Sequence, residues 1–324
     1  MATVSEPANL TTTAAGTKIV SLGAEAQLHQ GESNTKRSLR RLLKHRMAVV
    51  GIVLLAFVIL YVSIGSLIYS EAYANHNDPT RKLEAPSSEH PFGTDSIGRD
   101  LLARTIYGGQ ISILVGVTAV IVSLTVGTAV GLASGYFGGI IDTVLMRLVE
   151  AALSIPQLFV ALLASRMFAG KLPDFTIGGR EFSNTLIVIV FAIGLTSWMQ
   201  LSRIVRSMVL SIKQQEYITA ARALGAPSWR IVMQHILPNC LAPIIVAATL
   251  GVASAILLEA YLSFLGLGVR APTATWGNML FEAYENLQIW NQWFFPALFV
   301  ILTVLGINFF GDGLRDAFDP RSLK

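Results

Sequence analysis

The residue types that most often perform catalysis form no catalytic pattern in this chain. Its five histidines are His29, His45, His76, His90 and His235. They make no His-Glu-x-x-His zinc motif, and there is no Gly-x-x-x-x-Gly-Lys-[Ser/Thr] loop to hold nucleotide phosphates. A Gly-x-Ser-x-Gly nucleophile elbow is also absent from the sequence. The single cysteine, Cys240, has no second thiol for a disulfide or a metal site. We therefore expect no catalytic residues, no metal and no cofactor in the chain.

Ionisable residues are few within the long apolar stretches, where they are usually paired or functional. Arg147 and Glu150 are three residues apart, the spacing of an ion pair on one helix face. Glu259 comes late in an apolar block, and we expect it near the outer membrane interface. No series of carboxylates indicates a proton or sodium relay, which disfavours an ion-coupled transporter without excluding it.

A polar segment at residues 211–238 has the pattern of a short surface helix over 216–224. Its apolar stripe at i, i+3, i+4 and i+7 consists of Tyr217, Ala220, Ala221 and Leu224. Gly225 is a suitable helix stop, and Pro227 suits the start of the next helix. Such a helix can dock into a groove on a partner. It can equally belong to a solvated loop, and the residues alone leave both interpretations open.

Three further features predict how the elements are held. Asp95, Arg99 and Asp100 lie close enough in sequence to pair and order an outer loop, a structural role. Small residues recur every fourth position at Gly127, Gly131 and Gly135, which predicts close packing of one helix face within the chain. Pro156 interrupts an apolar block, and we expect a static kink there.

Apolar blocks dominate the composition. Of the 324 residues, 53% are hydrophobic and 14% are charged, whereas about a quarter are charged in soluble domains. About 20 apolar residues cross a hydrocarbon core as a helix, and these blocks are too long for barrel strands. We predict an all-α, polytopic membrane protein with six transmembrane helices. They lie at 47–69, 111–136, 143–168, 184–210, 239–264 and 293–314.

The distribution of Lys and Arg predicts the orientation. With the N-terminus inside, the inner connecting segments carry fourteen Lys and Arg, and the outer ones carry eight. Both termini are therefore expected in the cytoplasm. The net charge of +4 does not indicate nucleic-acid binding.

This orientation divides the chain into four parts. Residues 1–46 are a cytoplasmic N-terminal tail with a basic juxtamembrane segment, and 47–69 is an uncleaved first transmembrane helix. Residues 70–110 form a periplasmic or extracellular loop. The core at 111–324 contains the five further helices and the 211–238 loop.

The 211–238 loop resembles the Glu-Ala-Ala…Gly…Ile-x-Leu-Pro loop of permeases in binding-protein-dependent ATP-binding cassette importers. The matching residues are Ala220, Ala221, Gly225, Leu237 and Pro238. Thr219 stands where the motif has glutamate, and His235 stands where it has isoleucine. The resemblance implies that an ATPase subunit is contacted by Glu216, Tyr217, Thr219, Ala220, Ala221, Leu224 and Gly225. Glu216, one turn away, is a candidate substitute for the missing motif carboxylate.

Other motifs resemble the second permease subunit of dipeptide and oligopeptide importers. They are His90-Pro91-Phe92-Gly93-Thr94-Asp95, Gly98-Arg99-Asp100, the segment at 262–268, Trp276-Gly277, Asn308-Phe309, the segment at 311–316, and Asp319-Pro320. Together these motifs cover about residues 90 to 320, and they are specific as a set.

The resemblance implies a type I importer permease fold in the bacterial or archaeal cytoplasmic (inner) membrane, in contact with lipid. The expected partners are a homologous second permease, two ABC ATPase subunits that bind ATP and Mg, and an extracytoplasmic solute-binding protein. The expected function is peptide import, with the helix at 216–224 coupling ATP hydrolysis to transport. Import of glutathione, a nickel chelate or a sugar is the first alternative, and an ion-coupled secondary transporter is the second.

Overall fold

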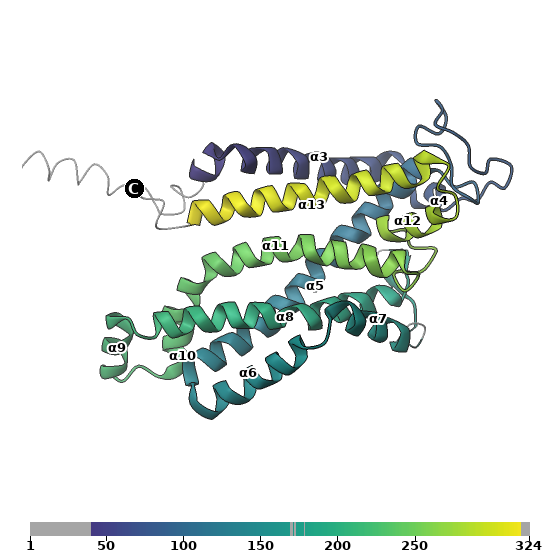
Figure 1. Cartoon of the computed structure of the whole chain (residues 1–324). Coiled ribbons are helices and arrows are strands. Elements are labelled where there is room, and N and C mark those ends of the chain that lie inside the picture. The colour runs from purple at the N-terminus through teal and green to yellow at the C-terminus, as the bar shows by residue number, and fades with distance from the viewer. Residues whose placement is uncertain (1–39, 169–170, 172, 178, 319–324) are drawn as a thin grey trace, which may run out of the picture.

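The computed structural model describes residues 40–168, 171, 173–177 and 179–318. The described chain is built almost entirely from long helices that run roughly side by side (Figure 1). Strands β1 (Phe175–Ile177) and β2 (Arg180–Phe182) form an antiparallel hairpin. Residues 1–39 of the predicted N-terminal tail and the motif residues Asp319 and Pro320 lie outside the described residues.

The helices follow one another as α3 (Arg46–Ile68), α4 (Glu71–Ala74), α5 (Leu101–Phe137), α6 (Gly139–Leu153), α7 (Gln157–Phe168), α8 (Thr185–Ile212), α9 (Glu216–Ala223), α10 (Ser228–Arg230), the π-helical segment η1 (Ile231–Ile236), α11 (Leu237–Phe264), α12 (Trp276–Tyr284) and α13 (Trp290–Phe318).

Five helical stretches of the described chain are long and apolar enough to cross a membrane. They are α3, α5, α8, the continuous stretch Ser228–Phe264, and α13. A sixth span is formed if α6 and α7 are counted together, although they are bent by 82°. The predicted all-helical membrane fold is confirmed, with five spans or six when the bent pair counts as one.

The second span begins ten residues earlier than the sequence predicted. Leu101 opens α5 because the Asp100 side chain caps it, accepting a hydrogen bond from the Ala103 N–H at 2.7 Å. The prediction assigned residues 101–110 to the outer loop. The structure buries Arg104, and Gly109 allows close packing, since an added Cβ there would lie 2.5 Å from the Trp276 ring.

The predicted third span is divided in two. Pro156 precedes α7, and the helix axis changes direction by 82° between α6 and α7. Proline has no backbone donor and its ring clashes with the preceding turn, so helical hydrogen bonding stops before it. The expected kink is therefore a full break of the helix.

Glycines set the closest helix contacts. Gly127, Gly131 and Gly135 on α5 face α8, where an added Cβ would approach Leu201, Val205 or Val209 to 3.0 Å or less. Packing of this face within the chain is thus confirmed. At the other side of the bundle α3 and α13 lie side by side (Figure 1), and Gly51 of α3 faces the α13 backbone.

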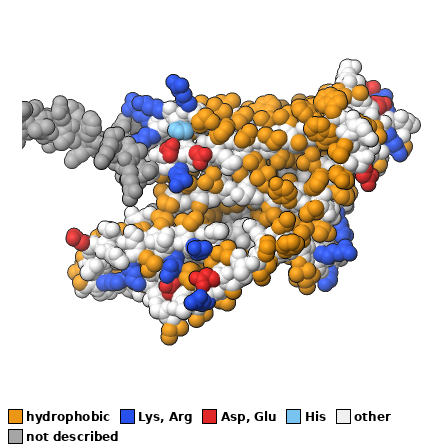
Figure 2. Space-filling view, in the orientation of Figure 1, with side chains coloured by type: hydrophobic (Ala, Val, Ile, Leu, Met, Phe, Trp, Pro, Cys, Tyr) orange, Lys and Arg blue, Asp and Glu red, His pale blue; other side chains and the backbone are white. Residues whose placement is uncertain are grey.

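The surface is apolar in the middle and charged towards the ends. Figure 2 shows hydrophobic side chains covering the central part of the molecule, with Lys and Arg mainly towards the two ends. Leu67 and Ile140 are 85% and 83% exposed within the chain. Apolar exposure on this scale is expected where a protein faces lipid or another subunit.

Candidate functional site

The short helix α9 lies at one end of the bundle, beyond the end of α8 (Figure 1). It spans Glu216–Ala223, and its C-cap is Leu224. Gly225 then adopts a φ of 79°, and the Ala226 N–H donates to the Ala221 carbonyl at 3.1 Å. A left-handed residue with this bond ends a helix, and glycine adopts that conformation without a steric penalty. The helix and its stop lie where the sequence placed them.

One side chain anchors α9 to the bundle. Ile218 is fully buried, in a cluster that includes Val209 of α8 and Ile231 and Ile236 of η1. Ala221 packs against the same cluster and is partly buried. Sequence reasoning missed Ile218, although its spacing of three from Ala221 places both on one helix face.

The predicted apolar stripe is mostly on the outside. Tyr217 is 45% exposed and Leu224 is 88% exposed, and Ala220 is also exposed. Trp229, just after Gly225, is 70% exposed. These four side chains, Tyr217, Ala220, Leu224 and Trp229, form what we call the α9 platform. An exposed group of apolar residues at the end of a helical bundle is typical of a protein contact.

The other predicted coupling residues are accessible as well. Glu216, Thr219 and Gly225 are exposed. In the described part of the chain, the side chains of Glu216 and Thr219 make no hydrogen bond or ion pair. Both are therefore available to a partner, and Glu216 opens the first turn of α9.

Cationic side chains connect α9 to the end of α5. The Arg222 guanidinium lies over the Tyr136 ring at 5.4 Å, and the Lys213 ammonium lies over the same ring at 5.8 Å. Lys213 also donates to the Tyr136 carbonyl at 2.5 Å. Arg222 of α9 and Lys213 at the end of α8 thus both contact Tyr136 at the end of α5.

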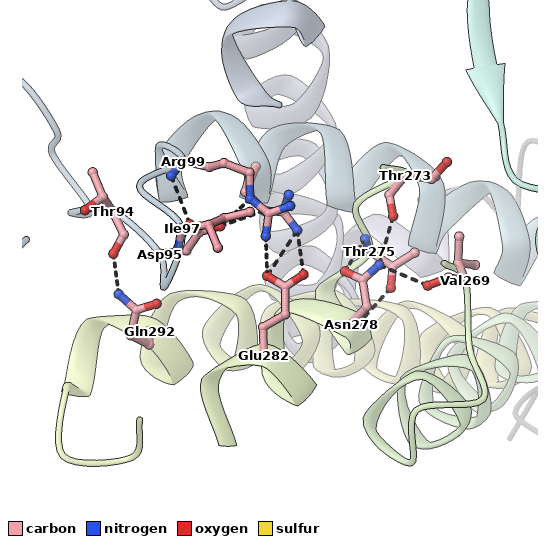
Figure 3. A network of polar contacts seen from close by, with 11 residues as sticks. Thr94, Asp95, Ile97, Arg99, Val269, Thr273, Thr275, Asn278, Glu282 and Gln292 are labelled. Carbon is pink, nitrogen blue, oxygen red and sulfur yellow. Dashed lines mark hydrogen bonds and ion pairs between the residues drawn. The ribbon is translucent and has the colours of Figure 1, made fainter. Parts of the chain in front are cut away.

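A buried ion network lies at the opposite end of the molecule (Figure 3). Arg99 donates from Nε to Asp95 Oδ2 at 2.5 Å and from Nη2 to Glu282 Oε2 at 2.6 Å. Arg104 Nη2 lies 3.3 Å from Glu282 Oε1, and its Nε lies 3.6 Å from Asp95 Oδ2. Two guanidinium groups thus share two carboxylates, so the four charges cancel.

The predicted pairing of the outer loop is confirmed for Asp95 and Arg99 but is wrong for Asp100. The Asp100 carboxylate caps α5 and lies 2.7 Å from His90 Nδ1. Asp95 also accepts from the Ile97 and Arg99 N–H groups, at 3.0 and 2.9 Å. All three residues are buried, which supports a structural role.

Arg104 and Glu282 were not anticipated. They are 178 residues apart in the sequence, on α5 and α12. Arg104 is 1% exposed, and its Nε and Nη1 atoms have no hydrogen-bond partner among the described residues. An arginine in this position depends on its two carboxylate neighbours, because an unpaired buried charge is strongly unfavourable.

Neutral polar side chains complete the outer cap that joins α12 and α13 to the loop (Figure 3). Asn278 and Thr275 form a capping box at the start of α12. The Asn278 amide donates to the Val269 and Thr273 carbonyls at 3.1 and 2.8 Å. Gln292 donates to the Thr94 carbonyl at 2.5 Å. The segment between α11 and α13 is therefore ordered around α12.

Glu259, which was expected near the outer membrane interface, is fully buried within the protein. Its carboxylate accepts from Ser112 Oγ at 3.0 Å and from Ser263 Oγ at 2.7 Å. Ser112 also accepts from the Trp276 N–H at 3.2 Å. Glu259 thus connects α11, α5 and α12, and hydropathy alone could not show this. The predicted Arg147–Glu150 pair is present at 3.1 Å, with both side chains exposed.

Two family models match the sequence. Residues 127–324 match the binding-protein-dependent transport system inner membrane component family. Residues 33–86 match the N-terminal transmembrane domain of oligopeptide transport permease C.

Curated proteins of similar length are also close in sequence. The chain is 38% identical over 301 residues to the oligopeptide transport system permease protein OppC of Haemophilus influenzae, covering 92% of this chain and 91% of that protein. It is 41% identical over 288 residues to the dipeptide transport system permease protein DppC of Alkalihalophilus pseudofirmus, covering 88% and 90%. A solved structure of the MetNI methionine ABC transporter in an inward-facing conformation matches with a TM-score of 0.52 and 18% identity, over 66% of this chain and 96% of that one. At that identity it supports the fold alone.

The outer network makes a prediction about stability. Glu282→Gln should destabilise the protein by roughly 3 kcal/mol, because it leaves Arg99 and Arg104 with too little negative charge in a buried site. The shift in the thermal unfolding midpoint of the purified protein measures this. Glu285→Gln, at the exposed end of the same helix, is the matched control and should leave the midpoint unchanged. Equal midpoints for the two variants would contradict the proposed importance of the network.

Proposed function

This chain belongs to the family of inner membrane components of binding-protein-dependent transport systems, and we propose that it is the permease subunit of an ATP-driven importer of oligopeptides or dipeptides. It is a multi-pass inner-membrane protein and not itself the ATPase. The peptide substrate is supported by the match of residues 33–86 to oligopeptide permease C and by the names of its relatives.

The system works with a binding protein and an ATPase, as its family description and the relatives indicate. We propose a specific assembly of four kinds of subunit. This chain pairs with a homologous second permease, two ABC ATPases lie at the α9 end, and the solute-binding protein docks at the α12 end. In this assembly the start of α3 and the end of α13, which lie on the α9 side (Figure 1), face the cytoplasm.

The observation that carries the coupling role is the exposure of the α9 platform. Ile218 holds α9 to α8 and η1, while Tyr217, Ala220 and Leu224 face outward. A helix that is anchored by one face and exposes an apolar face can transmit the movement of a bound partner to the spans behind it. Glu216 and Thr219 are available for polar contacts at the same surface.

Transport in proteoliposomes tests the function. The transporter, reconstituted with its second permease, ATPases and binding protein, should take up a labelled tripeptide when ATP is supplied. Uptake should persist when ionophores collapse the proton and sodium gradients, because ATP supplies the energy. Uptake that instead requires an ion gradient and ignores ATP would refute the proposal.

Ala220→Asp tests the coupling surface. Ala220 is exposed, so a carboxylate there should leave folding intact but place a charge in an apolar contact. We expect uptake to fall by about tenfold or more, the effect of a misplaced buried charge. The protein level in the membrane should be normal. Ala220→Ser keeps the side chain small and should retain uptake; normal uptake by Ala220→Asp would exclude docking at this surface.

Thiol labelling in intact cells tests the orientation. Cys240, the chain's one cysteine, is buried and is replaced by serine in the parent. Ser88→Cys, in the exposed loop before α5, should react with a membrane-impermeant maleimide added from outside. Ser228→Cys, beside the α9 platform, should react only after permeabilisation. The reverse pattern would place the termini outside.

A further inference from the structure

A hollow of about 520 Å³ lies between α5, the α6–α7 break, α8 and α11. Its volume falls in the range of about 300–1,000 Å³ that is usual for small-molecule sites. Much of its wall is apolar, with Leu124 from α5, Met199 from α8 and Leu250 from α11. The break itself contributes Ile155 and Pro156. In Figure 1 the pair α6 and α7 lies along α8, so the hollow is bordered by the bent span.

The polar part of this wall is entirely neutral. It consists of the side chains of Ser123, Gln157, Thr196, Ser197, Gln200 and Ser254. No Lys, Arg, Asp or Glu lines the hollow within the described residues. A fixed charge in such a low-dielectric site would attract one sign of solute charge and exclude the other. The neutral wall can form hydrogen bonds with a solute without selecting for the sign of its charge.

Gln157 is held in a defined orientation by α8. Its Nε2 donates to Thr196 Oγ1 at 3.1 Å and to Ser197 Oγ at 2.9 Å. Both hydroxyls donate in turn to carbonyls of α8, at Ala192 and Ile193. The two hydroxyl oxygens therefore accept hydrogen bonds from the NH₂ group of Gln157, which fixes the orientation of its amide. The Gln157 carbonyl oxygen has no donor among the described residues, so it is available to a solute N–H.

A second hollow, of about 510 Å³, continues from the first towards the α9 end. Gln200 and Ile204 line both. Beyond them the lining becomes charged, with Glu150, Arg203 and Arg206. Arg206 is paired with Asp142 at 2.6 Å. Gln200 thus stands at the junction of a neutral compartment and a charged one.

We propose that the neutral hollow is the part of the solute path that this chain contributes, and that it binds peptide backbone amides rather than peptide charges. Gln157 and Gln200 are the specificity-determining residues. This inference rests on the proposed function as a peptide permease. Peptide N–H and C=O groups occur in every peptide whatever its side chains. Neutral amides and hydroxyls match them as donors and acceptors. The path can then pass acidic and basic peptides alike.

The experiment places a charge in the wall and measures charge selectivity. The reconstituted transporter, with all its subunits, is given Ala-Asp-Ala and Ala-Lys-Ala separately, and the ratio of the two uptake rates is compared between variants. Comparing ratios with the parent cancels the preference of the binding protein. Gln200→Glu keeps the side-chain shape but adds a negative charge. We expect the ratio of acidic to basic uptake to fall by about tenfold or more, because the charge acts in a low-dielectric site.

Two further variants make the result decisive. Ser254→Asp, on the α11 wall, should shift the ratio in the same direction, so the test does not depend on the folding of one variant. Gln288→Glu, exposed beyond α12 and outside both hollows, should keep the parental ratio. An unchanged ratio in a folded, transporting Gln200→Glu or Ser254→Asp protein would overturn the inference. If the parent takes up neither peptide, the proposed function fails instead.

Discussion

The backbone hydrogen bond is the constraint on which the structure depends. A peptide group in hydrocarbon has no water to bond, so each one must be satisfied inside the protein. The long helices α3, α5, α8, α11 and α13 meet this requirement along their length. The helix is interrupted between α6 and α7, and the residues of this break, Ile155 and Pro156, border the neutral hollow. Irregular backbone within a membrane protein is tolerated where it lines a cavity, and the break meets that condition.

The two ends of the bundle are stabilised differently. At the outer end two buried arginines pair with the buried Asp95 and the partly buried Glu282, which connects the loop, α5 and α12. At the inner end α9 is held mainly by Ile218 and exposes most of its remaining surface. Local stability follows the density of buried contacts, so the inner end is the part that responds most easily to a partner.

The sequence was sufficient for features that depend on neighbouring residues. The apolar blocks predicted the membrane spans. Gly225 and the helical spacing of the apolar residues before it predicted α9 and its C-terminal end. It could not show contacts between distant segments, such as Arg104 with Glu282. Nor could it show that Glu259 is buried within the protein, because hydropathy does not distinguish an exposed carboxylate from one that accepts hydrogen bonds from two serines. The helix α9 is rich in alanine and has several apolar faces, so the sequence does not show which one is buried. Ile218 is buried because Ile231 and Ile236 of η1 pack in the same cluster.

The contact between α3 and α13 has a consequence for how the protein is made. Gly51 of α3 receives the α13 backbone, and Gly306 of α13 lies against Leu54 and Leu55. Residues 69–289 are synthesised between these two helices. At about 5–20 residues per second, the ribosome needs roughly 10–45 s for them. Throughout that time Gly51 of α3 lacks the α13 backbone against which it packs. Of the described spans, the N-terminal one is thus completed by the C-terminal one, and their contact forms only after the residues of α13 have been synthesised.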